Sequence, residues 1–295
     1  MHPAPSLILF TVLSGFGFGL LAFLGAGWPA PVGLPAFILY GAGYGLAGAG
    51  LIAAAFHLGH PERALLAFTQ WRSSWLSREA VLSAATLAVM APHAAGAVFF
   101  GQPIPVLGMA GAGLAVATIT STAMIYAQIR AVPRWSNWTT PAVFLAAGLA
   151  GGALLAGHMW LSGWLMIVLG AALTVHWQTG DRRFAEAGST PETATGLGRI
   201  GRVRLFESPH TGSNYLLKEM VHQVGRRHAQ RLRLIALAAG ALGPAVLLLL
   251  LPASWLLLVL VLPLHLVGIL AARWLFFAEA EHAVGLYYGR AARAA

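Results

Sequence analysis

The sequence predicts an all-α, polytopic membrane protein with eight transmembrane helices and both termini in the cytoplasm. Its composition, the length of its apolar stretches and the placement of its charges lead to this prediction. Of the 295 residues, 58% are hydrophobic and 9% are charged, whereas soluble domains carry about 25% charged residues. The chain has no cysteine, which excludes disulfides, thiolate zinc sites and cysteine-ligated iron–sulfur clusters within it. Any electron that it handles must therefore come from another carrier.

Eight apolar stretches have lengths suited to crossing a bilayer. A helix needs about 20 apolar residues to cross a hydrocarbon core of about 30 Å. The fifth and sixth stretches are short, but together they exceed one span and are interrupted near 157–160, so they are interpreted as two helices. In chain order the predicted spans are 7–27, 36–57, 79–100, 106–129, 141–157, 161–178, 232–251 and 254–273.

The charges fall on one side of these spans. The links at 28–35, 101–105, 158–160 and 252–253 contain no Lys, Arg, Asp or Glu, and all 18 Lys and Arg residues belong to the opposite side. The positive-inside rule makes that side cytoplasmic. We therefore expect a multi-pass protein of the cell inner membrane, with 1–295 as a single integral-membrane domain. Topology then accounts for the net charge of +9, and no nucleic-acid partner is expected.

Two features of the first spans add to this picture. Residues 1–6 lack the basic region of a secretory signal, so the first span is expected to be retained. Glycines also recur at short spacings that let helix backbones approach closely. These are Gly15, Gly17 and Gly19 in the first span and Gly41, Gly43 and Gly45 in the second.

The segment between the second and third spans holds the clearest candidates for chemistry. His57 ends one apolar stretch and Glu79 begins the next, so both are predicted at the boundary between lipid and cytoplasm. Titratable residues at such a depth are functional candidates. The alternative is structural, with Ser77 capping the third helix and Glu79 suiting the helix dipole from the first turn. These residues alone leave both interpretations open.

The same segment carries a family resemblance. The pattern H-L-G-x-P-x-R-A at 57–64, followed by S-x-E at 77–79, resembles the membrane-anchor subunit of the dimethyl sulfoxide reductase family. The resemblance implies a molybdopterin catalytic subunit and an iron–sulfur subunit as cytoplasmic partners. This anchor would exchange electrons with a quinone, either ubiquinone or menaquinone. The family's quinol-site histidine and glutamate fall on His57 and Glu79, and the motif's arginine is Arg63.

Within this family, the cytoplasmic placement of the motif is more similar to the anchors of cytoplasmic sulfite dehydrogenases. That resemblance implies electron flow from sulfite oxidation to quinone. The alternative is a quinol-oxidising anchor of a dimethyl sulfoxide or polysulfide reductase.

Quinone reduction takes two electrons and two protons, so its site needs a polar donor at the carbonyl and a titratable route to water. His57 is suited to hold a carbonyl and to titrate near neutral pH, and Glu79 to pass protons. Trp75 is a candidate for stacking on the headgroup, and Arg63 for orienting Glu79 or pairing with a partner subunit. We expect these residues and Ser77 to form the quinone site, with no metal ligand.

The histidines and the long hydrophilic stretch leave further alternatives. A haem b anchor would need two facing histidines, for which His57 and His176 are the best pair, but the family resemblance is to haem-free anchors. A transporter would need ionisable residues near the midplane, where His265 is the clear example. The cytoplasmic loop at 179–231 contains apolar residues at 205–206 and 215–217, which predict a docking surface for the iron–sulfur subunit. Attraction to anionic lipid is the alternative for that loop.

Overall fold

The computed structural model describes residues 2–207, 220 and 228–288, which form helices and loops without any strand. This confirms the all-α prediction. The first half contains α1 (Pro5–Gly25), α2 (Gly33–Ala55), η1 (Pro61–Phe68), α3 (Trp75–Ala95), η2 (Gly96–Phe100) and α4 (Pro105–Ala127). The second half contains α5 (Thr139–Leu155), α6 (Met159–Glu186), α7 (Pro191–Thr195), η3 (Leu197–Arg199), α8 (Ala229–Leu237), η6 (Ala238–Leu242), α9 (Gly243–Leu250), α10 (Trp255–Ala278) and η7 (Ala283–Tyr288).

Seven helical stretches of the described chain are long and apolar enough to cross a membrane. They correspond to all the predicted spans except the fifth. That span is the helix α5, which has 17 residues and is shorter than the others. The π-helical turns η2 and η6 lie inside two of these stretches, after α3 and between α8 and α9.

Proline and glycine set several of the helix ends. Pro5 and Pro105 lie in the first turns of α1 and α4, where a missing backbone N–H costs no hydrogen bond. Gly101 ends η2 with a φ of 64°, and Gly157 separates α5 from α6 with a φ of 82°. A positive φ favours glycine over other residues, so the predicted break between the fifth and sixth spans is confirmed.

Three predicted helix boundaries were wrong by four residues or more, and one of them is the end of α10, which lies at Ala278 and not at Arg273. α3 begins at Trp75, with Ser74 at the cap position and no side-chain cap bond. Ser77 therefore lies inside the helix and does not cap it. α6 continues to Glu186, so the first residues of the predicted loop at 179–231 are helical. The parts of that loop at 208–219 and 221–227 lie outside the described residues.

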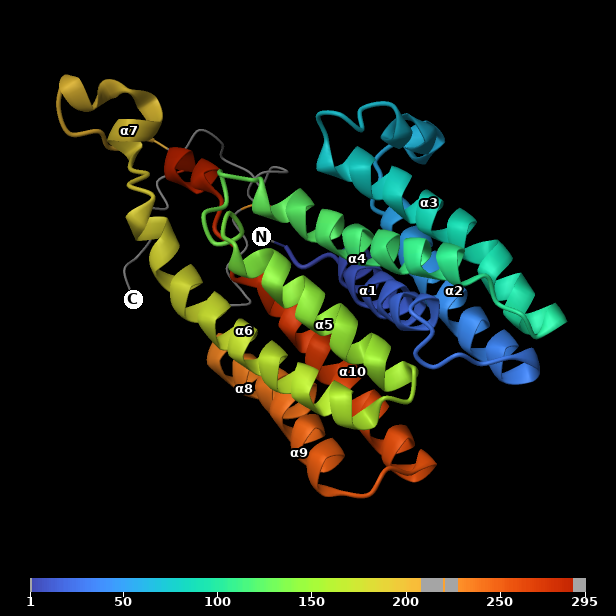
Figure 1. Ribbon diagram of the computed structural model, residues 1–295. Helices are drawn as coiled ribbons and strands as arrows, with labels where there is room; N and C mark the ends of the chain where they lie inside the picture. The colour runs from blue at the N-terminus through green and yellow to red at the C-terminus, as the bar shows by residue number, and fades with distance from the viewer. Residues whose placement is uncertain (1, 208–219, 221–227, 289–295) are drawn as a thin grey trace.

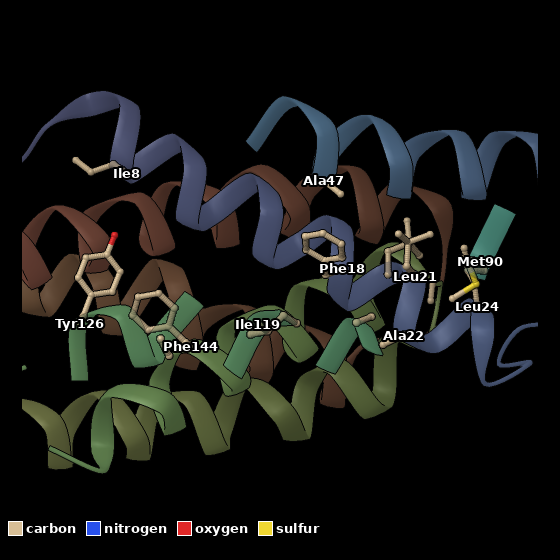
Figure 2. Packing of buried hydrophobic residues seen from close by; sticks show 14 of the residues in the cluster. Ile8, Phe18, Leu21, Ala22, Leu24, Ala47, Met90, Ile119, Tyr126 and Phe144 are labelled. Atoms are coloured by element: carbon tan, nitrogen blue, oxygen red, sulfur yellow. The ribbon is translucent and has the colours of Figure 1, made fainter. Parts of the chain in front are cut away.

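The helices form two packed groups, a first group of α1 to α4 and a second group of α5 to α10, which meet mainly where α1 and α4 pack against α5 (Figure 1). α1 packs most extensively against α2, α5 and α4, while α3 packs against α4 and α6 packs against α5. Figure 2 shows buried side chains of α1, among them Phe18, Leu21 and Leu24, lying against residues of the neighbouring helices. Leu21 and Leu24 are fully buried. Burial of aliphatic side chains around one central helix therefore holds the two groups together.

Close backbone approaches accompany this packing. A Cβ atom on Gly19 would meet the backbone of Gly148 and Gly152 in α5, and one on Gly17 would meet Ala47 in α2. The predicted role of glycine in helix packing is confirmed at these positions. It was wrong for Gly41 and Gly45, where an added Cβ would meet no atom within 4 Å.

The links between helices lie at two opposite ends of the bundle. Those after α2 and α6, which carry η1 and α7, lie at one end, and the links that join α1 to α2 and α9 to α10 lie at the other (Figure 1). The first pair is charged and the second is uncharged. The charged segments are thus gathered at one end, as the sequence predicted.

Candidate functional site

The segment between α2 and α3 folds back onto the start of α3 and leaves a groove there. η1 packs against α3, and the groove has a volume of about 390 Å³. Its polar lining comes from His60, Arg63, Gln70, Ser74 and Ser77, and its apolar lining from Leu58, Ala64, Leu66, Ala67 and Leu76. A mostly apolar wall with a few polar groups is typical of small-molecule sites, which commonly measure about 300–1,000 Å³.

Two of the predicted site residues, Arg63 and Ser77, line this groove together. Ser77 is 2% exposed, and its hydroxyl donates to the carbonyl of Ala67. The same oxygen accepts the backbone N–H of Gln70 at 3.0 Å. Ser77 therefore bonds to the opposite wall of the groove.

His57 and Trp75 lie at the margins of the groove and are absent from its lining. His57 is exposed, just beyond the end of α2, and precedes Leu58, which does line the groove. Trp75 begins α3, and its ring is covered by the guanidinium of Arg78 at 4.4 Å. That face of the Trp75 ring is occupied by a side chain of the protein itself.

Glu79 faces the interior. It is 4% exposed, and one carboxylate oxygen accepts the hydroxyl of Thr122 in α4. No side-chain hydrogen bond or ion pair joins His57 to Glu79 within the described residues. Ser77 and Glu79 are two positions apart, about 200° around a helix, which puts their side chains on nearly opposite faces of α3.

A row of hydroxyls continues from Glu79 along the α3–α4 contact. Thr86 and Thr118 share a hydrogen bond at 3.1 Å, and Thr122 lies one turn beyond Thr118. Sequence reasoning missed Thr122 as the partner of Glu79. The signal was present, because the run T-I-T-S-T at 118–122 is unusually polar for an apolar span.

A buried arginine lies close to this row. Arg273 of α10 is 3% exposed, with its Cζ 3.5 Å from the centroid of the Phe144 ring. Tyr126 also packs on Phe144. A cavity of about 10 Å³, lined by Thr122, Phe144 and the hydroxyls of α1, lies among these groups and has room for about one water molecule. The sequence had placed Arg273 at a helix end.

A four-residue ionic cluster closes the charged end of the second group. Arg233 donates to Glu279 at 2.9 Å and to both oxygens of Asp181 at 2.7 and 2.9 Å. Arg134 donates to Asp181 at 2.7 Å. Burial raises the pKa of Glu279, and the charges of Arg134 and Arg233 oppose that rise. The cluster joins α6, α8, the α4–α5 link and the end of α10.

The intramembrane histidines have local partners. His176 shares a hydrogen bond with Thr139 at 2.8 Å and stacks on Phe276. His265 bonds to the carbonyl of Gly240 at 2.6 Å and stacks on Phe16. His176 therefore packs between α5 and α10, whereas His57 lies at the end of α2. Among the described residues, no three His, Asp or Glu side chains are grouped to hold a metal ion.

Comparison with known proteins supplies the family. Residues 1–163 match the family described as DMSO reductase anchor subunit (DmsC). The chain belongs to the DMSO reductase anchor subunit family. It is also 32% identical, over 326 aligned residues, to a subunit of the sulfite dehydrogenase of Allochromatium vinosum, covering 98% of this chain and 99% of that protein. No solved structure matches it significantly.

The two matches extend over different lengths of this anchor. The family match ends within the first turns of α6 and includes the groove, Glu79 and Thr122. Only the alignment with the Allochromatium protein extends over α8 to α10, including Arg233 and Arg273. The resemblance inferred from the motif at 57–64 is thus confirmed, and the chain is a membrane anchor subunit in an oxidoreductase context.

Proposed function

We propose that this membrane anchor is also the quinone-reactive subunit of its complex, and that the groove between η1 and α3 receives the quinone headgroup. The groove carries this proposal. It offers about 390 Å³ behind a mostly apolar wall, with the guanidinium of Arg63 as a donor. The long quinone tail would remain in the lipid, to which the apolar faces of α2 are open.

The proposed topology has eight spans, with α5 as the short fifth span and both termini in the cytoplasm. The gathering of charged links at one end supports this orientation under the positive-inside rule. An iron–sulfur subunit and a molybdopterin catalytic subunit would then dock on the cytoplasmic end in the inner membrane. Exposed apolar side chains in the described part of 179–231 support such docking, since Phe206 is 96% exposed and Ile200 is 84% exposed.

In the proposed reaction, Arg63 in the lining of the groove and His57 at its margin hold the carbonyl oxygens of the quinone through N–H donors. Two electrons arrive singly from the iron–sulfur subunit, and two protons complete the quinol. The groove lies on one side of α3 and Glu79 lies on the nearly opposite side. A proton from Glu79 would therefore reach the quinone headgroup through intervening water. Electrons and protons enter from the same side, and the step should therefore move no net charge across the membrane.

Sulfite is the proposed electron donor of the whole complex. The name of the Allochromatium relative supports this substrate class. Oxidation of sulfite to sulfate takes its oxygen atom from water and releases two protons and two electrons, which matches the two-electron demand of one quinone. Catalysis of that half-reaction would belong to the partner subunit.

The test uses the complex purified with its own partner subunits. Sulfite-dependent reduction of a short-chain ubiquinone should fall by about 100-fold in Glu79→Gln, in line with the loss of a proton-transfer group, and by at least about tenfold in His57→Ala and Arg63→Gln. Reduction of a water-soluble dye by the same preparations should stay at the wild-type rate and so report intact partner subunits. A His57→Ala complex that reduces quinone normally would remove His57 from the site. Quinol-dependent reduction of dimethyl sulfoxide or polysulfide, without sulfite oxidation, would reverse the proposed direction.

A further inference from the structure

η1 forms one wall of the groove, and few of its apolar side chains are buried against the rest of the protein. Leu65 is 79% exposed and Leu66 is 60% exposed. Of the residues in η1 whose side chains are described, only the small Ala64 and Ala67 are partly buried. Segments with few buried apolar contacts open at low free-energy cost. The position of this wall must therefore depend on its polar contacts.

Two consecutive residues of α3 supply those contacts. The hydroxyl of Ser77 binds the carbonyl of Ala67 and the N–H of Gln70. The guanidinium of Arg78 donates to the carbonyls of Trp71 and Arg72 at 3.0 and 2.7 Å. We call these four bonds the α3 clamp. It holds the chain between 67 and 72 against the start of α3.

The chemistry of Ser77 excludes it as a donor to a quinone in this arrangement. A serine hydroxyl has one proton, and that proton goes to Ala67. A quinone carbonyl only accepts hydrogen bonds, so it would have to compete with Ala67 for this proton. Ala67, Gln70 and Ser77 all line the groove, and the clamp therefore fixes the spacing between its two walls.

We propose that Ser77 and Arg78 are positioning residues, which set the width of the groove and thereby its affinity for the quinone headgroup. This inference rests on the proposed function and replaces the direct quinone contact expected for Ser77. Loss of the clamp should weaken quinone binding without slowing the reaction of bound quinone. KM should change while kcat does not.

The test compares Ser77→Ala with Ser83→Ala in the intact complex. Ser83 is a matched control, because it lies buried on the same helix and, within the part of the chain that the structure describes, its hydroxyl bonds only to Ala80 of that helix. Loss of the two Ser77 bonds should raise the KM for a short-chain ubiquinone about tenfold, with kcat changed less than about twofold. Amide hydrogen exchange at 67–72 should accelerate by a similar factor. Ser83→Ala should leave both quantities unchanged.

Arg78→Met provides a second arm, with Arg72→Met as the control for the lost positive charge. Arg78→Met should repeat the KM increase and the faster exchange, and Arg72→Met should do neither. Unchanged exchange and KM in both Ser77→Ala and Arg78→Met would overturn the clamp, even if Glu79→Gln abolishes quinone reduction. Faster exchange with an unchanged KM would instead show that the clamp exists but that quinone binds elsewhere, which would overturn the placement of the quinone in this groove.

Discussion

A methyl group on Gly19 would test the contact that joins the two helix groups. Its Cβ would meet the carbonyl group of Gly148, whose carbon would lie at 2.8 Å, and the Cα of Gly152 at 3.3 Å. These are backbone atoms of α5 and cannot rotate away, so α1 and α5 would have to separate. Overpacking of this kind costs about 1–3 kcal/mol, and alanine recovers up to about 1 kcal/mol through its higher helix propensity. Gly19→Ala should therefore lower the free energy of unfolding by about 1–2 kcal/mol.

The assay is thermal unfolding of the detergent-solubilised protein, followed by tryptophan fluorescence. The expected loss corresponds to a decrease in Tm of about 2–8 °C for a chain of this size. Gly45→Ala is the control, because a Cβ at that position would meet no atom within 4 Å, and its Tm should stay constant or rise slightly. Equal decreases in both variants would refute the argument that the α1–α5 backbone contact requires glycine at position 19.

Three further predictions follow from the second helix group. Arg233→Met should lower the free energy of unfolding by about 1–3 kcal/mol in a thermal-unfolding assay. Among the described residues, the variant leaves Glu279, which is 6% exposed, with only the 3.7 Å contact to Arg134. Arg183→Met is the control at an exposed position. Trp135→Phe should cost about 1–3 kcal/mol in the same assay, since the indole N–H donates at 2.8 Å to the buried carbonyl of Phe276; a variant as stable as the wild type would contradict this. The purified anchor subunit should lack b-type haem absorption, because His176 packs between α5 and α10 whereas His57 lies beyond the end of α2. Haem bands in reduced-minus-oxidised spectra would contradict this.

The positions of the helices follow from the sequence because the bilayer imposes a length. Stretches such as 106–129 must be about 20 residues long and apolar, and α4 at Pro105–Ala127 differs from that prediction by only one or two residues at each end. The prediction was wrong where a helix leaves the apolar region. α3 starts four residues before Glu79, and α6 runs eight residues past Gln178, because polar residues continue a helix as readily as apolar ones once water is available.

The candidate site was less predictable for a physical reason. The residues of 57–79 can be read from the chain, but the direction in which each side chain points depends on where α3 begins and which helix lies beside it. A helix that began just after Ser77 would have made Ser77 its N-cap residue. The actual start at Trp75 turns Ser77 toward η1 and Glu79 toward Thr122. A shift of four residues in one boundary thus separates two residues that the motif presents together.

The side chain of Arg273 lies near the contact between the two helix groups. Its guanidinium is buried over Phe144, against which Tyr126 also packs. Burying an arginine without a bonded carboxylate is costly, and such residues inside membranes are usually functional. Thr122, which donates to Glu79, and Phe144, which lies under Arg273, line the same small cavity between the two groups. Arg273 itself lies away from the groove, because no part of the second group contributes to the lining of the groove.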